Sequence, residues 1–193
     1  MSYVAWFSNP NGPFCALTYL KDVKDSFELK RGISRADRFN SAAHFVMDPN
    51  HRDRVLADSL YNLDRMVVVS PPLRAFIEQH EPARVEYLTV SILDHDGEVA
   101  AADYTLLNPL EVVDCIDKDR STLSWNAIDP DLITGPEELV FDFDEVGTEE
   151  LPLIRPRHLP YLVLVRQDLG EAIEGEGFGG IYFAELDELD SLI

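Results

Sequence analysis

The residues of this chain that could carry out chemistry are its carboxylates, its histidines and its two cysteines. The sequence holds 36 Asp and Glu, five His and two Cys among 193 residues. The histidines form no i, i+4 pair, and none has a cysteine at ligand spacing, so the pattern predicts no zinc site. The common serine-nucleophile motifs, Gly-x-Ser-x-Gly and Ser-x-x-Lys, are absent. We therefore expect a protein that is not an enzyme and that has no catalytic residue, no metal and no cofactor.

One polar run between strand-like segments leaves a second interpretation open. Asn108, Asp114, Asp117 and Ser121 are short polar residues, and such side chains satisfy backbone groups in tight chain reversals. We interpret them as a hydrogen-bonded structural corner. A small hydrolase or transferase with paired carboxylates is the alternative, and it would need Asp114 or Asp117 in a pocket with a raised pKa.

A glycine-rich run, Gly175-Glu-Gly-Phe-Gly-Gly180, has the composition of a phosphate-binding loop. Such a loop follows a strand and begins a helix, so that backbone amides at the helix N-terminus face the phosphate. Here the run follows a predicted helix, precedes a predicted strand and contains a carboxylate. We interpret it as a helix C-cap and a turn.

The net charge of the chain narrows the choice of partners. With 16 Lys and Arg against 36 Asp and Glu, the formal charge is −20; residues 1–100 contribute −3 and residues 101–193 contribute −17. So acidic a surface repels phosphate backbones and anionic lipid headgroups, and we expect neither nucleic acid nor a membrane surface as partner. We expect a monomer or a weak homo-oligomer, because a high net charge opposes self-association.

Two segments carry most of the acidic residues. Glu137–Glu150 contains seven carboxylates and no cation, and Asp168–Asp190 contains eight, again without a cation. Apolar residues alternate with the carboxylates in both segments. We therefore expect ordered elements whose solvent-facing side is acidic, and not low-complexity tails.

The clearest structural pattern is a strand, a helix and a strand in the middle of the chain. Met66–Ser70 is a β-branched run typical of a buried strand. Ser70 is a suitable N-cap, and the two prolines after it are tolerated in the first turn of a helix that ends near Pro82. Val85–Leu93 is the next strand, and a turn at Asp94–Gly97 leads to a hairpin partner at Ala101–Leu107.

The same order recurs near the C-terminus, as strand Leu162–Val165, a helix and strand Ile181–Ala184. An offset of 96 residues places Leu73 on Leu169 and Ile77 on Ile173. Both an old duplication and a chance likeness of short motifs are compatible with this match.

Strands outnumber helices in the predicted pattern. We therefore expect an α+β fold in a single domain of residues 1–193, with a mainly antiparallel or mixed sheet, two strand–helix–strand units and few helices. Residues 1–50 form a strand-rich segment whose role is the least clear. The elements expected outside the two units are strands at Tyr3–Phe7, Phe14–Leu20 and Val112–Val113 and a helix at Arg54–Leu63.

The sequence predicts a cytoplasmic protein. No cationic residue precedes Lys21, as a secretory signal would require, and no apolar run approaches the roughly 20 residues of a membrane span. Cys15 and Cys115 belong to no Cys-x-x-Cys pair, so we expect two reduced thiols. A single long-range disulfide is the alternative, and it would require an oxidising compartment.

Five short motifs follow one another in a fixed order along the chain. They are Val67–Leu73, Val85–Val90, Tyr104–Leu110, Val113–Asp117 with Ser121, and Phe178–Phe183. In this order the motifs resemble family eleven of the bacterial immunity proteins of polymorphic toxin systems, once known only as a domain of unknown function and typified by a myxobacterial protein. The resemblance covers residues 55–187, and residues 1–50 match nothing in the family.

The resemblance implies a non-enzymatic protein that binds and neutralises a cognate toxin domain encoded nearby. It transfers no catalytic residue to this chain. An acidic second half would complement a basic groove on such a toxin and accelerate association. A regulatory protein-binding module without a toxin partner is the other interpretation that stays open. The residues expected at the interface are Asp142, Asp144, Glu145, Glu171, Glu174 and Glu176.

Overall fold

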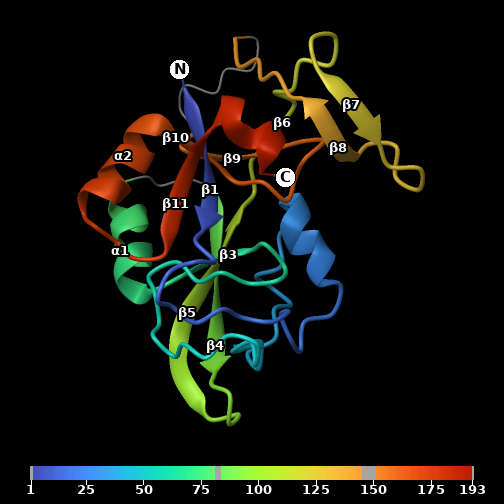
Figure 1. Cartoon of the computed structure of the whole chain (residues 1–193). Helices are drawn as coiled ribbons and strands as arrows, with labels where there is room; N and C mark the ends of the chain where they lie inside the picture. Colours follow the sequence, from blue (N-terminus) through green and yellow to red (C-terminus); the bar gives the residue numbers. More distant parts are fainter. Residues whose placement is uncertain (1, 81–83, 145–150, 193) are drawn as a thin grey trace.

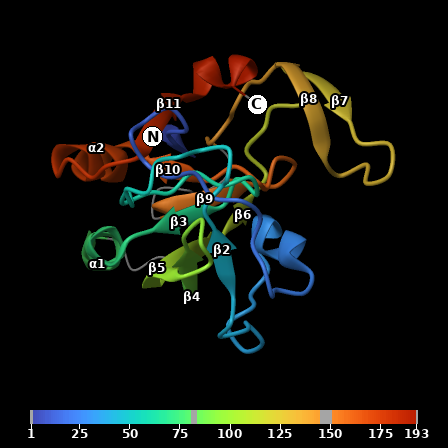
Figure 2. The same cartoon turned by 60° about the horizontal axis from the view of Figure 1, so that its bottom comes forward.

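The computed structural model describes residues 2–80, 84–144 and 151–192, and it arranges them in three β-sheets and two α-helices (Figure 1). The sheets are antiparallel or mixed, and strands outnumber helices, which confirms the α+β class. In Figures 1 and 2 the two helices lie together on one side of the molecule, and a two-stranded hairpin projects from the other.

The first sheet has four strands, in the order β2 (His44–Val46), β4 (Val85–Leu93), β5 (Val99–Pro109) and β3 (Val67–Val69). The long β4–β5 hairpin forms its centre, as predicted, and Asp94 closes the turn by accepting hydrogen bonds from the amides of Asp96 and Glu98. The carboxylate at the first turn position mimics a backbone acceptor, which is why Asp favours such turns.

The second sheet has five strands and joins the two ends of the chain. Its order is β11 (Ile181–Glu185), β1 (Tyr3–Ser8), β10 (Leu164–Arg166), β9 (Leu153–Pro156) and β6 (Val112–Val113). The N-terminal strand β1 pairs antiparallel with β10 on one side and with β11 on the other. The predicted strand at Tyr3–Phe7 is thus confirmed, as a central strand.

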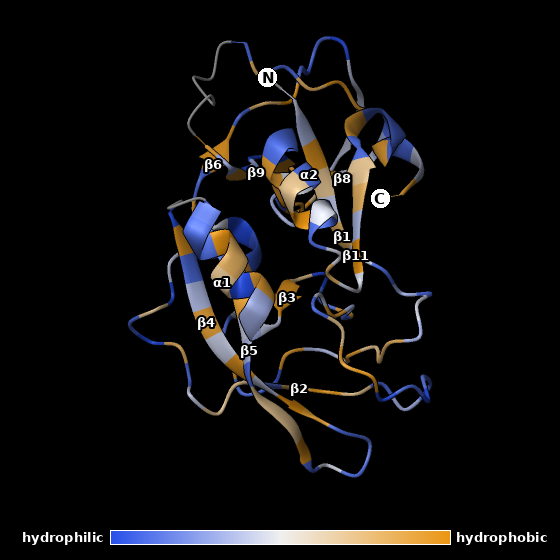
Figure 3. Ribbon diagram, turned by 90° about the vertical axis from the view of Figure 1, so that its left-hand side faces the viewer, coloured by the Kyte–Doolittle hydropathy of each residue, from blue (hydrophilic) through white to orange (hydrophobic). Residues whose placement is uncertain are grey.

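Two helices complete the two strand–helix–strand units. Helix α1 (Pro71–His80) follows β3, and Ser70 caps it by accepting a hydrogen bond from the Leu73 amide at 3.4 Å. Helix α2 (Gln167–Gly175) follows β10. Figure 3, seen from this side of the molecule, shows both helices in front of the strands, with hydrophilic turns on their outer surfaces.

The strand register shows that the two units are equivalent. In the first unit, Thr105 of β5 lies opposite Val69 of β3 and Thr89 of β4. In the second unit, Val4 of β1 lies opposite Val165 and Glu185. Residues 165 and 185 follow residues 69 and 89 by 96 positions in each case. In each unit an antiparallel strand therefore lies between the unit's own two strands: β5 in the first unit and β1 in the second. The two arrangements have the same register.

The apolar core forms three clusters, one of which belongs to both units. The shared cluster contains Leu73 and Ile77 of α1 together with Leu169 and Ile173 of α2, all at most 3% exposed. A second cluster covers the other face of the four-stranded sheet, and a third covers the other face of the five-stranded sheet. Burial of these aliphatic side chains is the main source of stability.

Three further elements, a hairpin and two 3₁₀ helices, cover the second and third clusters. The hairpin of β7 (Thr122–Trp125) and β8 (Ile133–Glu138) and the short 3₁₀ helix η3 (Leu186–Ser191) pack over the five-stranded sheet. A 3₁₀ helix η1 (Ser26–Arg31) lies close to that hairpin. In Figure 1 η1 is the blue helix below β8.

The predicted helix at residues 54–63 is wrong. Its backbone pairs with three other segments: Val55 and Tyr61 accept from the amides of Cys15 and Leu17, and the Leu60 amide donates to Val68. These long-range bonds replace the local bonds of a helix. The predicted strand at residues 14–20 is likewise reduced to isolated bridges at Leu17.

The glycine-rich run follows α2 and precedes β11, as the C-cap interpretation requires. Gly177 and Gly180 have positive φ angles of 75° and 80°. The Gly179 amide donates to Asp58, whose other oxygen accepts from the Ser70 hydroxyl. A Cβ on Gly180 would lie 2.3 Å from the Ser59 carbonyl oxygen. The glycines thus permit a close backbone contact, and the loop is structural.

The two cysteines are free and buried in different core clusters. Burial raises the pKa of Cys15 to about 11 and that of Cys115 to about 12. Both are therefore unreactive thiols, because the thiolate is the nucleophilic form.

Candidate functional site

Two of the four polar corner residues lie in one hydrogen-bonded reversal. The Asp117 carboxylate accepts from the amides of Asp119 and Arg120, both at 3.0 Å. The Ser121 hydroxyl accepts from the Val140 amide at 2.9 Å, and the Asp117 amide donates to the Val140 carbonyl. These bonds join the turn before β7 to the segment after β8, so both side chains serve the backbone.

Asp114 lies nearby, between a lysine and a histidine. It pairs with Lys118 at 3.0 Å, and its other oxygen is 3.4 Å from Nε2 of His158. Burial opposes ionisation of this carboxyl, but the Lys118 hydrogen bond and charge outweigh it, so the pKa of Asp114 is lowered. The hydrogen bonds from Arg120 lower the pKa of Asp117 in the same direction. A carboxylic acid in catalysis needs a raised pKa, so the hydrolase interpretation gains no support here.

The fourth residue, Asn108, lies elsewhere. It is fully buried on β5, and its Nδ2 donates to Glu86 at 3.0 Å and to the Ile33 carbonyl at 3.2 Å. Glu86 also accepts from the amides of Arg35 and Ala36 and from the Ser34 hydroxyl. Desolvation raises the pKa of Glu86, but these hydrogen bonds together lower it. Asn108 and Glu86 therefore hold the loop after η1 against the sheet.

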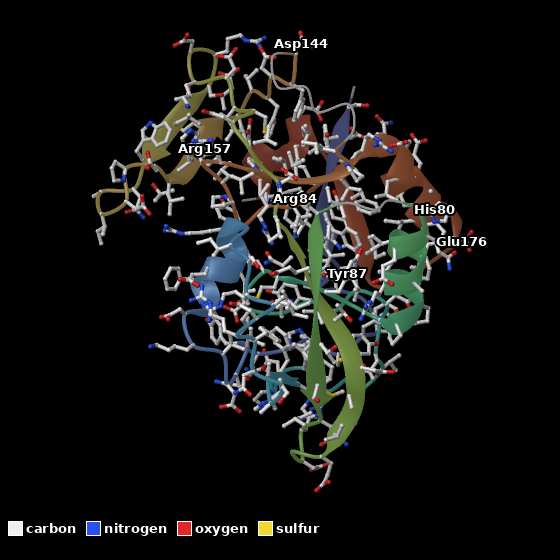
Figure 4. The ribbon with its side chains drawn as sticks, turned by 180° about the vertical axis from the view of Figure 1, so that it is seen from behind. His80, Arg84, Tyr87, Asp144, Arg157 and Glu176 are labelled. Carbon is white, nitrogen blue, oxygen red and sulfur yellow. The ribbon has the colours of Figure 1, made fainter. Side chains whose placement is uncertain are left out.

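The predicted acidic interface residues occupy two separate places. Asp142 and Asp144 follow β8, where Asp142 lies 3.4 Å from Arg120. Glu171 and Glu174 are exposed on α2, and Glu176 is exposed just after it. Figure 4 shows Asp144 at one end of the molecule and Glu176 beside His80 of α1 at another edge. Glu145 lies outside the described residues. The five described positions thus do not form a single patch.

A groove that the sequence did not predict runs along the end of β1. Its volume is about 470 Å³, and its wall includes Trp6 and Asn9, Tyr61 and Arg65 of the loop before β3, and Tyr182 of β11. The Trp6 indole donates to the Ser59 hydroxyl at 3.2 Å, which fixes the floor of this groove. Aromatic walls with a few polar groups are typical of binding grooves.

A second groove of about 540 Å³ adjoins the first between η1 and β8. Arg65 and Tyr161 line both grooves, and we call the pair the double groove. Phe27 and Leu63 form apolar walls of the second groove. His158 also lines it, and its Nδ1 donates to the Asp131 carbonyl at 2.7 Å, because a carbonyl oxygen can only accept.

The backbone beside Arg65 holds an uncommon conformation. Arg65 has a φ of 56°, in the left-handed region. The buried Asn62 imposes it: its side chain donates to the carbonyls of Leu60 and Met66 and accepts from the Met66 amide. Residues held in this region are enriched at binding sites. Sequence motifs could not predict the groove, because the residues that line it come from segments far apart in the chain.

The described residues offer no place for a metal ion and no helix long enough to cross a membrane. No group of three or more His, Cys, Asp or Glu among them could hold a metal. Of the helices in the described ranges, none combines the necessary length with the necessary apolar content.

A scan of protein-family models finds one match, the immunity protein family Imm11, over residues 12–188. The chain belongs to the Imm11 immunity protein family. No curated protein matches the chain.

The Imm11 match begins earlier than the resemblance at residues 55–187 predicted. It includes η1 and the loop around Asn62, so the N-terminal segment from residue 12 onward is part of the family's domain. The Imm11 match includes residues that line each groove, such as Phe27 in the second and Tyr182 in the first, whereas residues 6–11 and Leu192 of the first groove lie outside it.

Proposed function

We propose that this Imm11 protein is the immunity protein of a bacterial polymorphic toxin system, and that it acts in the cytoplasm by binding and neutralising a cognate toxin domain. The observation that carries the proposal is the family match over residues 12–188. The side chains of Asp117, in which the alternative hydrolase would have sought its chemistry, and of Ser121 hold backbone groups. A binding role accounts for this arrangement.

The acidic second half supports the way in which such a protein would meet its toxin. Residues 101–193 carry −17 of the net charge of −20. Glu171, Glu174 and Glu176 are exposed, and none forms an ion pair within the described part of the chain. Unpaired carboxylates create a long-range negative potential, which attracts a toxin with a basic active-site groove and raises the association rate.

Growth of cells that express the toxin tests the proposal. The toxin domain encoded by the adjacent gene is expressed in a bacterial host, with and without this protein. We expect the toxin alone to stop growth and co-expression to restore it. A pull-down of the tagged toxin domain should recover this protein in the same cells.

Unchanged killing together with no recovered complex would contradict the proposal and favour a regulatory module with another partner. An unrelated acidic protein of similar size serves as the control. If it protects as well, charge alone neutralises the toxin and the family match does not explain the protection.

A further inference from the structure

Exposed apolar side chains gather around the double groove. Among the described residues ten large hydrophobic side chains are exposed, and four of them line the double groove. A fifth, Trp125, packs edge-on against His158 of the second groove. Contiguous exposed apolar surface on a soluble protein marks an interaction site, whereas scattered single residues do not. The four are Phe27 and Leu63 in the second groove and Tyr182 and Leu192 in the first.

Hydrogen bonds and an ion pair within the protein hold the segments that form this surface. Asn62 fixes the loop that carries Leu63 and Arg65, and the ion pair between Arg31 and Asp129 at 2.7 Å joins η1 to the hairpin. Asn126 orders the turn around Ile128 by accepting from the Ile128 amide at 2.8 Å. Ordered walls lower the entropy lost on binding, and they favour tight complexes.

The charge of the double groove is opposite to that of the molecule. Lys30, Arg31 and Arg65 line the second groove, against a single carboxylate, Asp64. Lys30 is paired with Asp64 and Arg31 with Asp129. Arg65 has no ion pair among the residues that the structure describes, although it lies close enough to Tyr161 to oppose the rise in the pKa of that tyrosine caused by burial.

We propose that the double groove is the docking site of the toxin domain, and that it receives an apolar projection of the toxin whose carboxylate pairs with Arg65. This inference rests on the proposed function. The Arg65 guanidinium, which forms no ion pair with another described residue, selects a carboxylate, because a charged partner restores the solvation that docking removes. The aromatic walls supply the buried contact area that determines the lifetime of a complex.

Two parts of the protein surface act at different stages of binding. The acidic residues on α2 act at long range and set the rate of association. The double groove acts after contact and sets the rate of dissociation, where most differences in affinity arise. Kinetic measurements distinguish the two roles.

The test uses the full-length protein and the purified toxin domain encoded by the adjacent gene, with rates measured by surface plasmon resonance. Two double variants remove exposed walls: Phe27→Ala with Leu63→Ala, and Tyr182→Ala with Leu192→Ala. We expect each to raise the dissociation rate about tenfold or more, with little change in association, as loss of an apolar anchor does. Arg65→Glu should weaken binding by a similar factor, and Arg65→Lys should restore much of it.

Val55→Ala with Val99→Ala is the matched control, because both valines are exposed (57% and 62%) and neither lines the double groove. Thermal unfolding should show that all variants remain folded. Equal dissociation rates for the groove variants and the control would overturn the docking site while leaving the proposed function intact. Failure of the wild-type protein to form any complex would overturn the proposed function, and the docking site with it.

Trp125 gives an independent readout in the unmodified protein. It is 40% exposed, whereas the other tryptophan, Trp6, is 4% exposed. Docking beside His158 should protect Trp125 fluorescence from quenching by acrylamide. Unchanged quenching in a complex that has formed would place the toxin elsewhere and contradict the proposal.

Discussion

The two strand–helix–strand units have the same internal geometry and different surfaces. Their helices bury equivalent residues in one shared cluster, with Leu73 and Ile77 matched by Leu169 and Ile173. On the outer side, Arg74 of α1 pairs with Glu78 at 3.0 Å, whereas Glu171 and Glu174 of α2 face no cation among the described residues. The comparison teaches that buried positions fix the fold, while the charges of α2 are available for a partner.

The last strands of the two units, β4 and β11, show a similar contrast. Glu86 of β4 and Tyr182 of β11 are equivalent positions, separated by 96 residues. Glu86 anchors the loop after η1, which covers its face of the sheet. Tyr182 is 43% exposed and lines the double groove. The second unit thus leaves Tyr182 exposed at a position whose equivalent in the first unit is covered by a loop.

The largest expected effect is a loss of stability when equivalent buried residues of the two helices are truncated. Ile77→Ala and Ile173→Ala each remove an isoleucine that is 0% exposed in the shared cluster. Each should lower the free energy of unfolding by about 2–5 kcal/mol, through lost burial and the cavity left behind. Urea denaturation measures both values. A difference between them of more than about 2 kcal/mol would mean that the two units do not contribute equally to this core.

The next effect concerns a position where the units differ. Arg84 precedes β4, and Gly180 stands at the equivalent place before β11 with a φ of 80°. Gly180→Ala should cost about 2–4 kcal/mol, because the left-handed conformation is strained and the new Cβ meets the Ser59 carbonyl. Gly97→Ala is the control: its φ is 83°, but nothing lies within 4 Å. A loss of about 1 kcal/mol is expected there.

Equal losses at the two glycines would contradict the assignment of Gly180 to a close backbone contact. Thermal or urea unfolding of both variants measures the two losses of stability.

A smaller effect on stability is expected at Glu86 of β4, whose carboxylate holds the loop after η1. The folded-state pKa of Glu86 is lowered, so its contribution to stability is fully present above the ordinary pKa of glutamate and is lost as the pH falls through the lowered pKa of the folded state. Glu86→Gln should therefore cost about 1 kcal/mol at pH 7, and the difference from wild type should shrink toward pH 3. Unfolding curves across this range measure it, and a gap that persists at pH 3 would contradict the role of the ionised carboxylate.

The smallest expected effect on stability belongs to α2. Glu171→Lys with Glu174→Lys should change the free energy of unfolding by less than about 0.5 kcal/mol, as exposed substitutions do. The same variant should slow association with the toxin domain about tenfold at low salt, and the difference should diminish at high salt. Glu78→Lys on α1 is the matched control and should bind at the wild-type rate. An unchanged rate for the α2 variant would overturn its role in steering.

Much of the fold was predictable because its signals are local. The β-branched run before α1, the N-cap at Ser70 and the 96-residue offset depend on short patterns, and the structure has them all. The segment 54–63 was mispredicted because its apolar spacing is helical, yet its hydrogen bonds go to Cys15, Leu17 and Val68, which spacing cannot reveal. The double groove was missed for the same reason: Phe27, Leu63 and Tyr182 meet only through the tertiary fold.

The most direct test of the central claim measures the association and dissociation rates of the purified protein with its proposed toxin domain, together with the activity of the toxin. The account predicts a complex that forms faster at low salt than at high salt, that dissociates faster when Phe27 and Leu63 are truncated, and that abolishes the activity of the toxin. A toxin that stays active and unbound at high concentrations of this protein would contradict the account.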